Sequence, residues 1–153
     1  MQVNILCLGS LKEQFLVDAV KEYSKRLSKF CKFNIIELKE ENITDLNLVT
    51  KSLEKESEEI LKHLKGYVVV LDILGTNISS EQLAQKLSDV QQNYSTITFV
   101  IGSSFGLSET VKQKAHLKLS FSKLTFPHQL FRVMLCEQIY RAFCINNNIK
   151  YHK

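Results

Sequence analysis

Apolar residues along the chain follow two spacings, and each predicts a type of element. Five short segments rich in apolar residues, with Val and Ile prominent, predict buried strands at 3–8, 33–38, 67–73, 96–101 and 117–121. Between them apolar residues recur every three or four positions, which predicts helices. The helices are expected at about 11–30, 50–64, 79–92, 108–115 and 129–146.

Strands that alternate with helices predict an α/β fold with a mostly parallel sheet flanked by helices. The 153 residues show no repeat, low-complexity tract or flexible linker, so one domain over residues 1–153 is expected. Two local signals refine this prediction. Ser79 with Gln82 matches a capping box at a helix start, and 75–77 (Gly-Thr-Asn) is typical of a turn.

The last predicted helix is apolar around most of its circumference. A helix on a protein surface usually carries one apolar stripe, so a helix covered on two sides lies in a core or in a subunit interface. In a chain of this length we favour an interface. The apolar positions of this helix are Leu130, Phe131, Val133, Met134, Leu135, Cys136, Ile139, Tyr140, Ala142, Phe143 and Ile145.

Composition limits the environments and partners of the chain. No apolar run approaches the roughly 20 residues that cross a bilayer, and the first residues lack the features of a signal peptide. We therefore expect a cytoplasmic protein whose four cysteines are reduced thiols. The net charge is +4 but uneven: segment 39–59 has seven acidic residues and three lysines, whereas 111–153 has eight basic residues and one acidic residue. This asymmetry indicates either a face that meets phosphate or a solvated basic surface.

Candidate chemistry lies where the predicted strands end, because ligands of parallel α/β sheets bind beyond the carboxyl ends of strands. Three segments qualify: 71–75, 102–106 and 121–126. Glycines at 102 and 106 permit close approach of a ligand to the backbone, although the spacing matches neither a dinucleotide-binding nor a Walker motif. The third segment alternates large apolar and small polar residues, a pattern that suits an apolar slot for an adenine. The alternatives are an ordinary strand-to-helix turn at 102–106 and a strand that continues to Pro127 at 121–126.

Several polar residues near the C-terminus are candidates for chemistry. His128 and Arg132 lie one helical turn apart and are expected to face the same ligand, while a structural role is the alternative for His128. Tyr151, His152 and Lys153 form either a frayed end or a group that stacks on a base and contacts phosphate.

Four segments together resemble a known family. They are the opening strand with Gly9, the LDILG segment at 71–75, the IGSSFGL turn at 101–107, and LSFSKLTFPHQLFRVMLCEQIYRAF followed by a terminal YHK. These features resemble the ribosomal RNA large subunit methyltransferase H family of the SPOUT class. The resemblance implies a C-terminal trefoil knot, which is rare in proteins, and a homodimer packed through the last helix. It also implies an S-adenosylmethionine-dependent methyltransferase that modifies N3 of a pseudouridine in 23S rRNA, on assembled ribosomes.

By the same resemblance, the methyl donor contacts a defined set of residues. They are Leu71, Gly102, Phe121, Ser122, Lys123, Leu124, Thr125 and Phe126. Candidate catalytic residues are His152, Tyr151, Arg132 and His128, and either histidine can accept the N3 proton near neutral pH. Alternatively the base ionises by itself, with Arg132 or Lys153 stabilising the anion. The tail is expected to act in its own site or across the dimer, and no metal is expected.

The turn departs from the family pattern at two positions. Ser103 replaces a usual second glycine, and Phe105 replaces a usual polar residue. If position 103 requires positive φ, serine would be strained there by roughly 1–2 kcal/mol. These two departures support one alternative function, a non-catalytic RNA- or ribosome-binding module that has lost the donor. A second alternative, independent of them, is an unknotted doubly wound nucleotide-binding protein. The absence of a phosphate-binding fingerprint argues against the second.

Overall fold

The computed structural model describes all 153 residues and places five parallel strands in one sheet, in the order β2-β1-β4-β3-β5. β1, β4 and the first half of β3 form its buried centre, because helices cover most of their apolar side chains on both faces. The strands are β1 (Gln2–Leu8), β2 (Lys32–Leu38), β3 (Tyr67–Asn77), β4 (Thr96–Ile101) and β5 (Leu117–Ser120).

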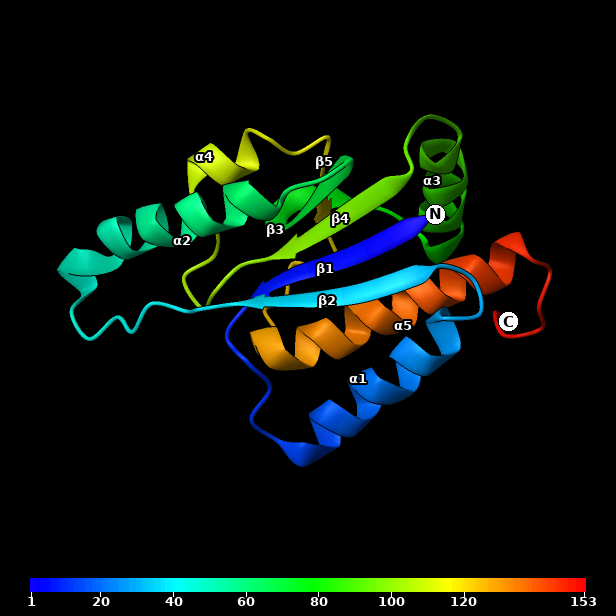
Figure 1. Cartoon of the computed structure of the whole chain (residues 1–153), viewed down its shortest axis with the longest axis horizontal. Helices are drawn as coiled ribbons and strands as arrows, with labels where there is room; N and C mark the ends of the chain where they lie inside the picture. Colours follow the sequence, from blue (N-terminus) through cyan, green and yellow to red (C-terminus); the bar gives the residue numbers. More distant parts are fainter.

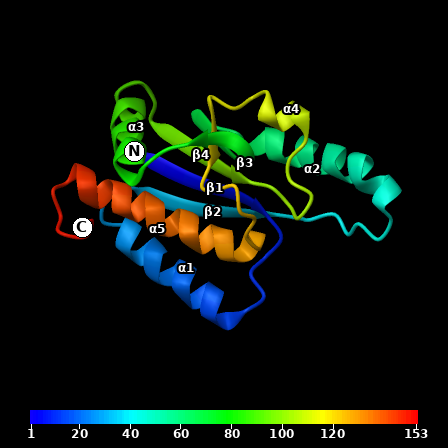
Figure 2. The same cartoon turned by 180° about the vertical axis from the view of Figure 1, so that it is seen from behind.

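Helices cover both faces of this sheet (Figures 1 and 2). On one face, α1, α3 and α5 pack over a core centred on Val69, Phe99 and Leu135. On the other, α2 and α4 cover a smaller core that includes Leu6, Val70 and Val100. The helices are α1 (Gln14–Leu27), α2 (Val49–His63), α3 (Ser80–Asn93), α4 (Glu109–Lys112) and α5 (His128–Asn146), with a 3-10 turn at Leu46–Leu48. The predicted α/β fold is confirmed.

β3 extends further than the sequence pattern predicts. We expected this strand to end at 73 and a turn at 75–77, but Thr76 and Asn77 pair with Leu119 and Ser120 of β5. The side-chain amide of Asn77 also donates to the Ser120 carbonyl oxygen at 2.9 Å. The register of pairing with β5 shifts between Leu71 and Thr76, so 72–75 form a bulge within β3. Pairing with a distant strand produces this bulge, and local residue preferences do not reveal it.

The start of α3 follows its sequence signal. The Ser79 hydroxyl accepts a hydrogen bond from the Gln82 backbone N–H at 3.2 Å, and the Gln82 side chain accepts one from the Ser79 N–H at 2.8 Å. The predicted capping box is therefore confirmed. It fixes the direction in which the chain leaves β3 and starts the return along the sheet.

α5 buries one side against the sheet and leaves a second apolar side partly open. Leu135, Cys136, Ile139 and Phe143 are buried in the core, whereas Val133 and Met134 remain partly accessible. The core of its own chain thus explains one apolar side of this helix. The other side, with Val133 and Met134, is the side available for a subunit interface. None of the helices is long and apolar enough to span a bilayer.

Candidate functional site

A cavity of about 510 Å³ opens at the carboxyl ends of β3, β4 and β5, the edge where the sequence places candidate chemistry. This volume lies within the range of about 300–1,000 Å³ that small-molecule sites occupy. Three separate segments line it, as expected from the strand ends. The lining includes seven of the eight predicted donor residues: Leu71, Gly102, Phe121, Ser122, Leu124, Thr125 and Phe126. Lys123 is exposed and does not line the cavity.

The wall after β4 is a tight turn that requires glycine at 102. A Cβ on Gly102 would lie 2.4 Å from the Gly106 carbonyl oxygen, which is far inside van der Waals contact. The turn closes through a hydrogen bond from the Gly106 N–H to the Ser103 carbonyl oxygen, at 2.9 Å. A side chain at 102 would therefore force this turn open and change the shape of the cavity.

Ser103 fits this turn without backbone strain. Asn148 is the only non-glycine residue with positive φ, so the strain considered for Ser103 does not arise. Its side chain, 7% exposed, donates a hydrogen bond to Oε2 of the buried Glu56 at 3.1 Å. Burial raises the pKa of the Glu56 carboxyl. Phe105, the other departure from the family pattern, is half-exposed and also lines the cavity.

The segment between β5 and α5 supplies an aromatic wall. The rings of Phe121 and Phe126 pack on Phe131, with centroid distances of 4.7 and 6.3 Å. The hydroxyl of Ser122 accepts a hydrogen bond from the Leu124 N–H at 2.9 Å, which shapes the loop between the two rings. These residues form an apolar slot flanked by backbone polar groups, as the sequence pattern predicts.

The β3 bulge, which lies in the candidate segment 71–75, supplies another wall of the cavity. Ile73 and Leu74 line the cavity and are exposed, and Asp72 also lines it while pairing with Lys112 at 3.1 Å. All three lie in the predicted segment 71–75, of which the family resemblance names only Leu71 as a donor contact. The Asp72–Lys112 pair joins the bulge to α4, so two of the cavity walls are held together.

The two candidate residues on the first turns of α5, His128 and Arg132, point to different parts of the molecule. His128 lines the cavity. Arg132 is 1% exposed and points to the ends of β1 and β2, where it contacts Oε1 of Glu37 at 2.5 Å and the Gly9 carbonyl oxygen at 3.0 Å. The two side chains therefore do not face one ligand in this structure, because the long Arg132 side chain is drawn to partners on the sheet.

The C-terminal tail lies at the other end of α5. His152 contacts Oε1 of Glu81 through Nε2 at 2.7 Å and Arg141 through Nδ1 at 3.2 Å. The Tyr151 hydroxyl donates to Oε1 of Glu137 at 3.0 Å. Hydrogen bonds from the Ser79 hydroxyl, the backbone and His152 lower the pKa of Glu81 to about 2, and burial raises the pKa of Tyr151.

This placement puts the tail far from the cavity of the same chain. The 19-residue α5, at 1.5 Å per residue, separates them by roughly 28 Å along the helix. Figure 1 shows the C-terminus near the start of β1, opposite the arrowheads of the strands. In this geometry Arg141 donates to Nδ1 of His152, which occupies the lone pair that a proton acceptor needs.

The buried thiols of Cys7 and Cys136 are poor candidates for a catalytic nucleophile. Burial raises the pKa of Cys7 to about 11 and that of Cys136 to about 12. A thiol acts as a nucleophile in its thiolate form, so neither side chain supplies one near neutral pH.

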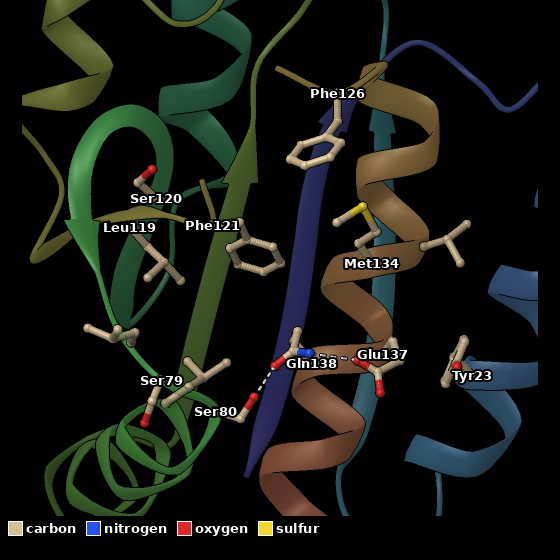
Figure 3. A pocket seen from close by; sticks show the side chains of 13 residues that line it. Tyr23, Ser79, Ser80, Leu119, Ser120, Phe121, Phe126, Met134, Glu137 and Gln138 are labelled. Carbon is tan, nitrogen blue, oxygen red and sulfur yellow. Dashed lines mark hydrogen bonds between the residues drawn. The ribbon is translucent and has the colours of Figure 1, made fainter. Parts of the chain in front are cut away.

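A second cavity, of about 560 Å³, lies beside the first between α3, β5 and α5 (Figure 3). Phe121 and Phe126 line both cavities, while Met134 and Glu137 face only the second. At its polar end, Ser80 donates to Gln138 at 2.8 Å, and Gln138 donates to Glu137 at 2.8 Å. The second cavity thus runs along the partly open side of α5.

Comparison with known proteins supports the resemblance seen in the sequence. Residues 1–152 match the family described as "Predicted SPOUT methyltransferase". A ribosomal RNA large subunit methyltransferase H from Caldicellulosiruptor saccharolyticus is 50% identical over 99% of both chains. A protein of the same name from Clostridium botulinum, strain Kyoto, is 51% identical over the full length of both. A putative member from Methanococcus maripaludis is 50% identical, also over both full lengths.

A solved structure shares the fold. The structure of a probable methylase family protein from Haemophilus influenzae aligns over 99% of this chain and 70% of its own, with a TM-score of 0.59 and 14% identity. The family match excludes the ordinary nucleotide-binding alternative, while the trefoil knot stays a prediction. With identity of about half over whole chains and the family match from 1 to 152, this chain belongs to the SPOUT methyltransferases, in the ribosomal RNA large subunit methyltransferase H family.

Proposed function

We propose that this protein transfers a methyl group from S-adenosylmethionine to N3 of a pseudouridine in 23S rRNA. The observation that carries the proposal is the cavity in which three segments, distant in sequence, bring together seven of the residues expected to contact the donor. The names of the relatives, ribosomal RNA large subunit methyltransferase H, support ribosomal RNA as the substrate. Action on assembled ribosomes in the cytoplasm belongs to the same proposal.

The residues of the cavity fit the donor chemically. Leu71, Phe121 and Phe126 offer an apolar slot for the adenine, and the backbone of the lining residues Gly102 and Thr125 would supply polar contacts. When bound, S-adenosylmethionine supplies a methyl group activated by a positively charged sulfur. The role of the cavity is to hold that methyl group in line with the target nitrogen, which is catalysis by positioning.

The N3 proton of the target base must also leave, because the neutral nitrogen has no available lone pair. His128 is the histidine that lines the donor cavity, and an imidazole can accept a proton near neutral pH. Among the residues of a single chain, we assign His128 as the proton acceptor. Arg132 is assigned a structural role because its guanidinium is engaged by Glu37 and backbone carbonyls.

A second copy of the chain is the proposed partner for the open side of α5. Val133 and Met134 line the second cavity, and two-fold packing of this helix on its symmetry mate would cover their apolar surface. The second cavity adjoins the donor cavity through Phe121 and Phe126, so a partner bound there would lie next to the donor.

The tail is proposed to complete the site of that partner. Tyr151 and His152 are too far along α5 to reach the cavity of their own chain, and a neighbouring chain is the remaining way to bring them to a donor. Mixed dimers test this. Mixing His152→Ala chains with Gly102→Ala chains should restore about a quarter of wild-type activity, since half of the dimers are mixed and each has one intact site. A tail acting within its own chain would restore none.

Exposed lysines would contact the RNA phosphates. Of the eight basic residues in 111–153, Lys112, Arg132 and Arg141 pair with acidic side chains of the protein itself. The other five are exposed and make no salt bridge: Lys114, Lys118, Lys123, Lys150 and Lys153. Contacts of this kind position RNA and weaken with salt, without reading its sequence.

Calorimetric titration with S-adenosylmethionine tests the donor site first. We expect a dissociation constant in the micromolar range, near −8 kcal/mol, for the wild type and no binding for Gly102→Ala, whose Cβ would displace the turn. Transfer of labelled methyl groups to ribosomes that lack the modification then tests the reaction. A protein that binds ribosomes but never the donor, with or without ribosomes present, would instead be a non-catalytic binding module.

A further inference from the structure

α2 carries two consecutive buried polar side chains that both contact the segment after β4. Glu56 and Ser57 are 2% and 5% exposed. The hydroxyl of Ser103 donates to Oε2 of Glu56 at 3.1 Å, and the hydroxyl of Ser57 shares a hydrogen bond with that of Ser108. α2 is therefore tied to both ends of segment 103–108, most of which lines the donor cavity.

The other carboxylate oxygen of Glu56 is also used. Oε1 accepts a hydrogen bond from the backbone N–H of Glu41 at 3.0 Å, in the loop that follows β2. A buried carboxylate costs free energy unless its lone pairs have donors. Glu56 thus joins α2, the loop after β2 and the Gly102–Gly106 turn. Ser103 is the residue of that turn to which Glu56 is hydrogen-bonded.

The turn itself has few internal restraints. One hydrogen bond, from the Gly106 N–H to the Ser103 carbonyl oxygen, closes it, and 104–106 are exposed. A glycine at 103 would leave Glu56 without a partner in the turn. The serine that departs from the family pattern therefore adds a restraint from outside the turn.

We propose that Glu56 is a positioning residue for the methyl donor: through the Ser103 hydroxyl it holds the Gly102–Gly106 turn in the shape that binds S-adenosylmethionine. The inference rests on the proposed donor site. It assigns a role in the reaction to α2, which contributes no side chain to the cavity. It also predicts that Glu56 and Ser103 act as one unit.

A double-mutant cycle on the full chain tests this unit. The donor dissociation constant is measured by calorimetry for the wild type, Glu56→Ala, Ser103→Ala and the double variant. Loss of a hydrogen bond to a charged group should weaken donor binding about tenfold in each single variant. The double variant should bind no more weakly than either single one, because both changes remove the same contact.

Two further variants separate positioning from general stability. Thr98→Val removes a different buried hydroxyl, on β4, which donates to the Lys65 carbonyl oxygen at 2.7 Å and lies outside the cavity. It should lower the unfolding temperature and leave donor affinity unchanged. Glu56→Gln should restore affinity to within about twofold of the wild type, because its amide can bond both the Glu41 N–H and the Ser103 hydroxyl.

The wild-type protein is titrated first, since absence of S-adenosylmethionine binding to it would overturn the proposed donor site itself. Given wild-type binding, unchanged affinity in Ser103→Ala would overturn the inference. Losses that add in the double variant would overturn it as well, because the residues would then act independently. If Glu56→Ala does not fold, Glu56→Leu, which fills more of the buried space, replaces it in the cycle.

Discussion

Arg132 shows how a residue with the sequence signature of a site can serve the fold. Its spacing from His128 predicts a shared face, yet the side chain bonds Glu37, 95 positions away, and the Gly9 carbonyl oxygen. These contacts anchor the first turns of α5 to the ends of β1 and β2. Because the segment between β5 and α5 leads directly into this helix, Arg132 holds that segment in place without lining the cavity.

Replacing Arg132 should therefore affect stability more than donor binding. Arg132→Ala leaves Glu37 and two carbonyl oxygens without their donor, and we expect the free energy of unfolding to fall by about 2–4 kcal/mol. Urea denaturation measures this change. Arg26→Ala, which breaks an exposed pair with Glu22, serves as control and should cost about 1 kcal/mol or less. Full stability combined with lost turnover would point to a catalytic role instead.

His152 should behave in the opposite way. It contacts Glu81 and Arg141 far from the donor cavity, so His152→Ala should leave the donor dissociation constant nearly unchanged. Turnover on ribosomes should fall about 10²-fold or more if the tail completes a partner's site. His63→Ala removes a partly exposed histidine that lines neither cavity and is the matched control. Collapse of donor affinity in His152→Ala would place the tail in the donor pocket.

The donor cavity could largely be predicted from the sequence because strand ends are local features. Leu71, Gly102 and Phe121 each lie at or near the end of a predicted strand, and parallel strands bring such ends to one edge. The Glu56–Ser103 and Arg132–Glu37 contacts could not be predicted, because their partners lie 47 and 95 positions apart. Spacing along the chain does not encode which helix face meets which turn.

Helices and strands differ in how well their ends were predicted. α3 begins where its capping box predicts, since both hydrogen bonds form between residues three positions apart. β3 continues past its predicted turn because pairing with β5 draws Thr76 and Asn77 back into the sheet. That bulge places Ile73 and Leu74 in the cavity wall. The cavity therefore owes part of its shape to strand pairing, which local patterns do not specify.

The capping box should be measurable in the stability of the whole chain. Ser79→Ala removes the hydroxyl that accepts from the Gln82 N–H, and we expect the free energy of unfolding to drop by about 1 kcal/mol. Ser28→Ala, at the C-terminal end of α1, removes a hydroxyl without an N-cap role and should cost less than half as much. Urea denaturation of both variants compares them directly. Equal losses would mean that the cap adds nothing beyond an ordinary hydroxyl contact.

In the proposed dimer, the two cavities would connect donor binding to assembly. They share Phe121 and Phe126, so a chain that packs on α5 over the second cavity would also contact the wall of the first. In such a dimer each donor lies near a foreign chain, and each tail leaves α5 away from its own donor. One surface would thereby serve association and catalysis together. This arrangement predicts that loss of the dimer and loss of turnover occur together.

A charge at Met134 tests that coupling. Met134 lines the second cavity beside Glu137, so Met134→Glu would bury an unpaired carboxylate near another acid in a dimer. We expect association to weaken about 100-fold or more, which sedimentation velocity at micromolar concentration would show as a monomer. Gln92→Glu places the same charge on exposed α3 surface outside both cavities and should remain dimeric. A dimeric Met134→Glu would place the interface elsewhere, whereas a monomer with full turnover would show that each chain completes its own site.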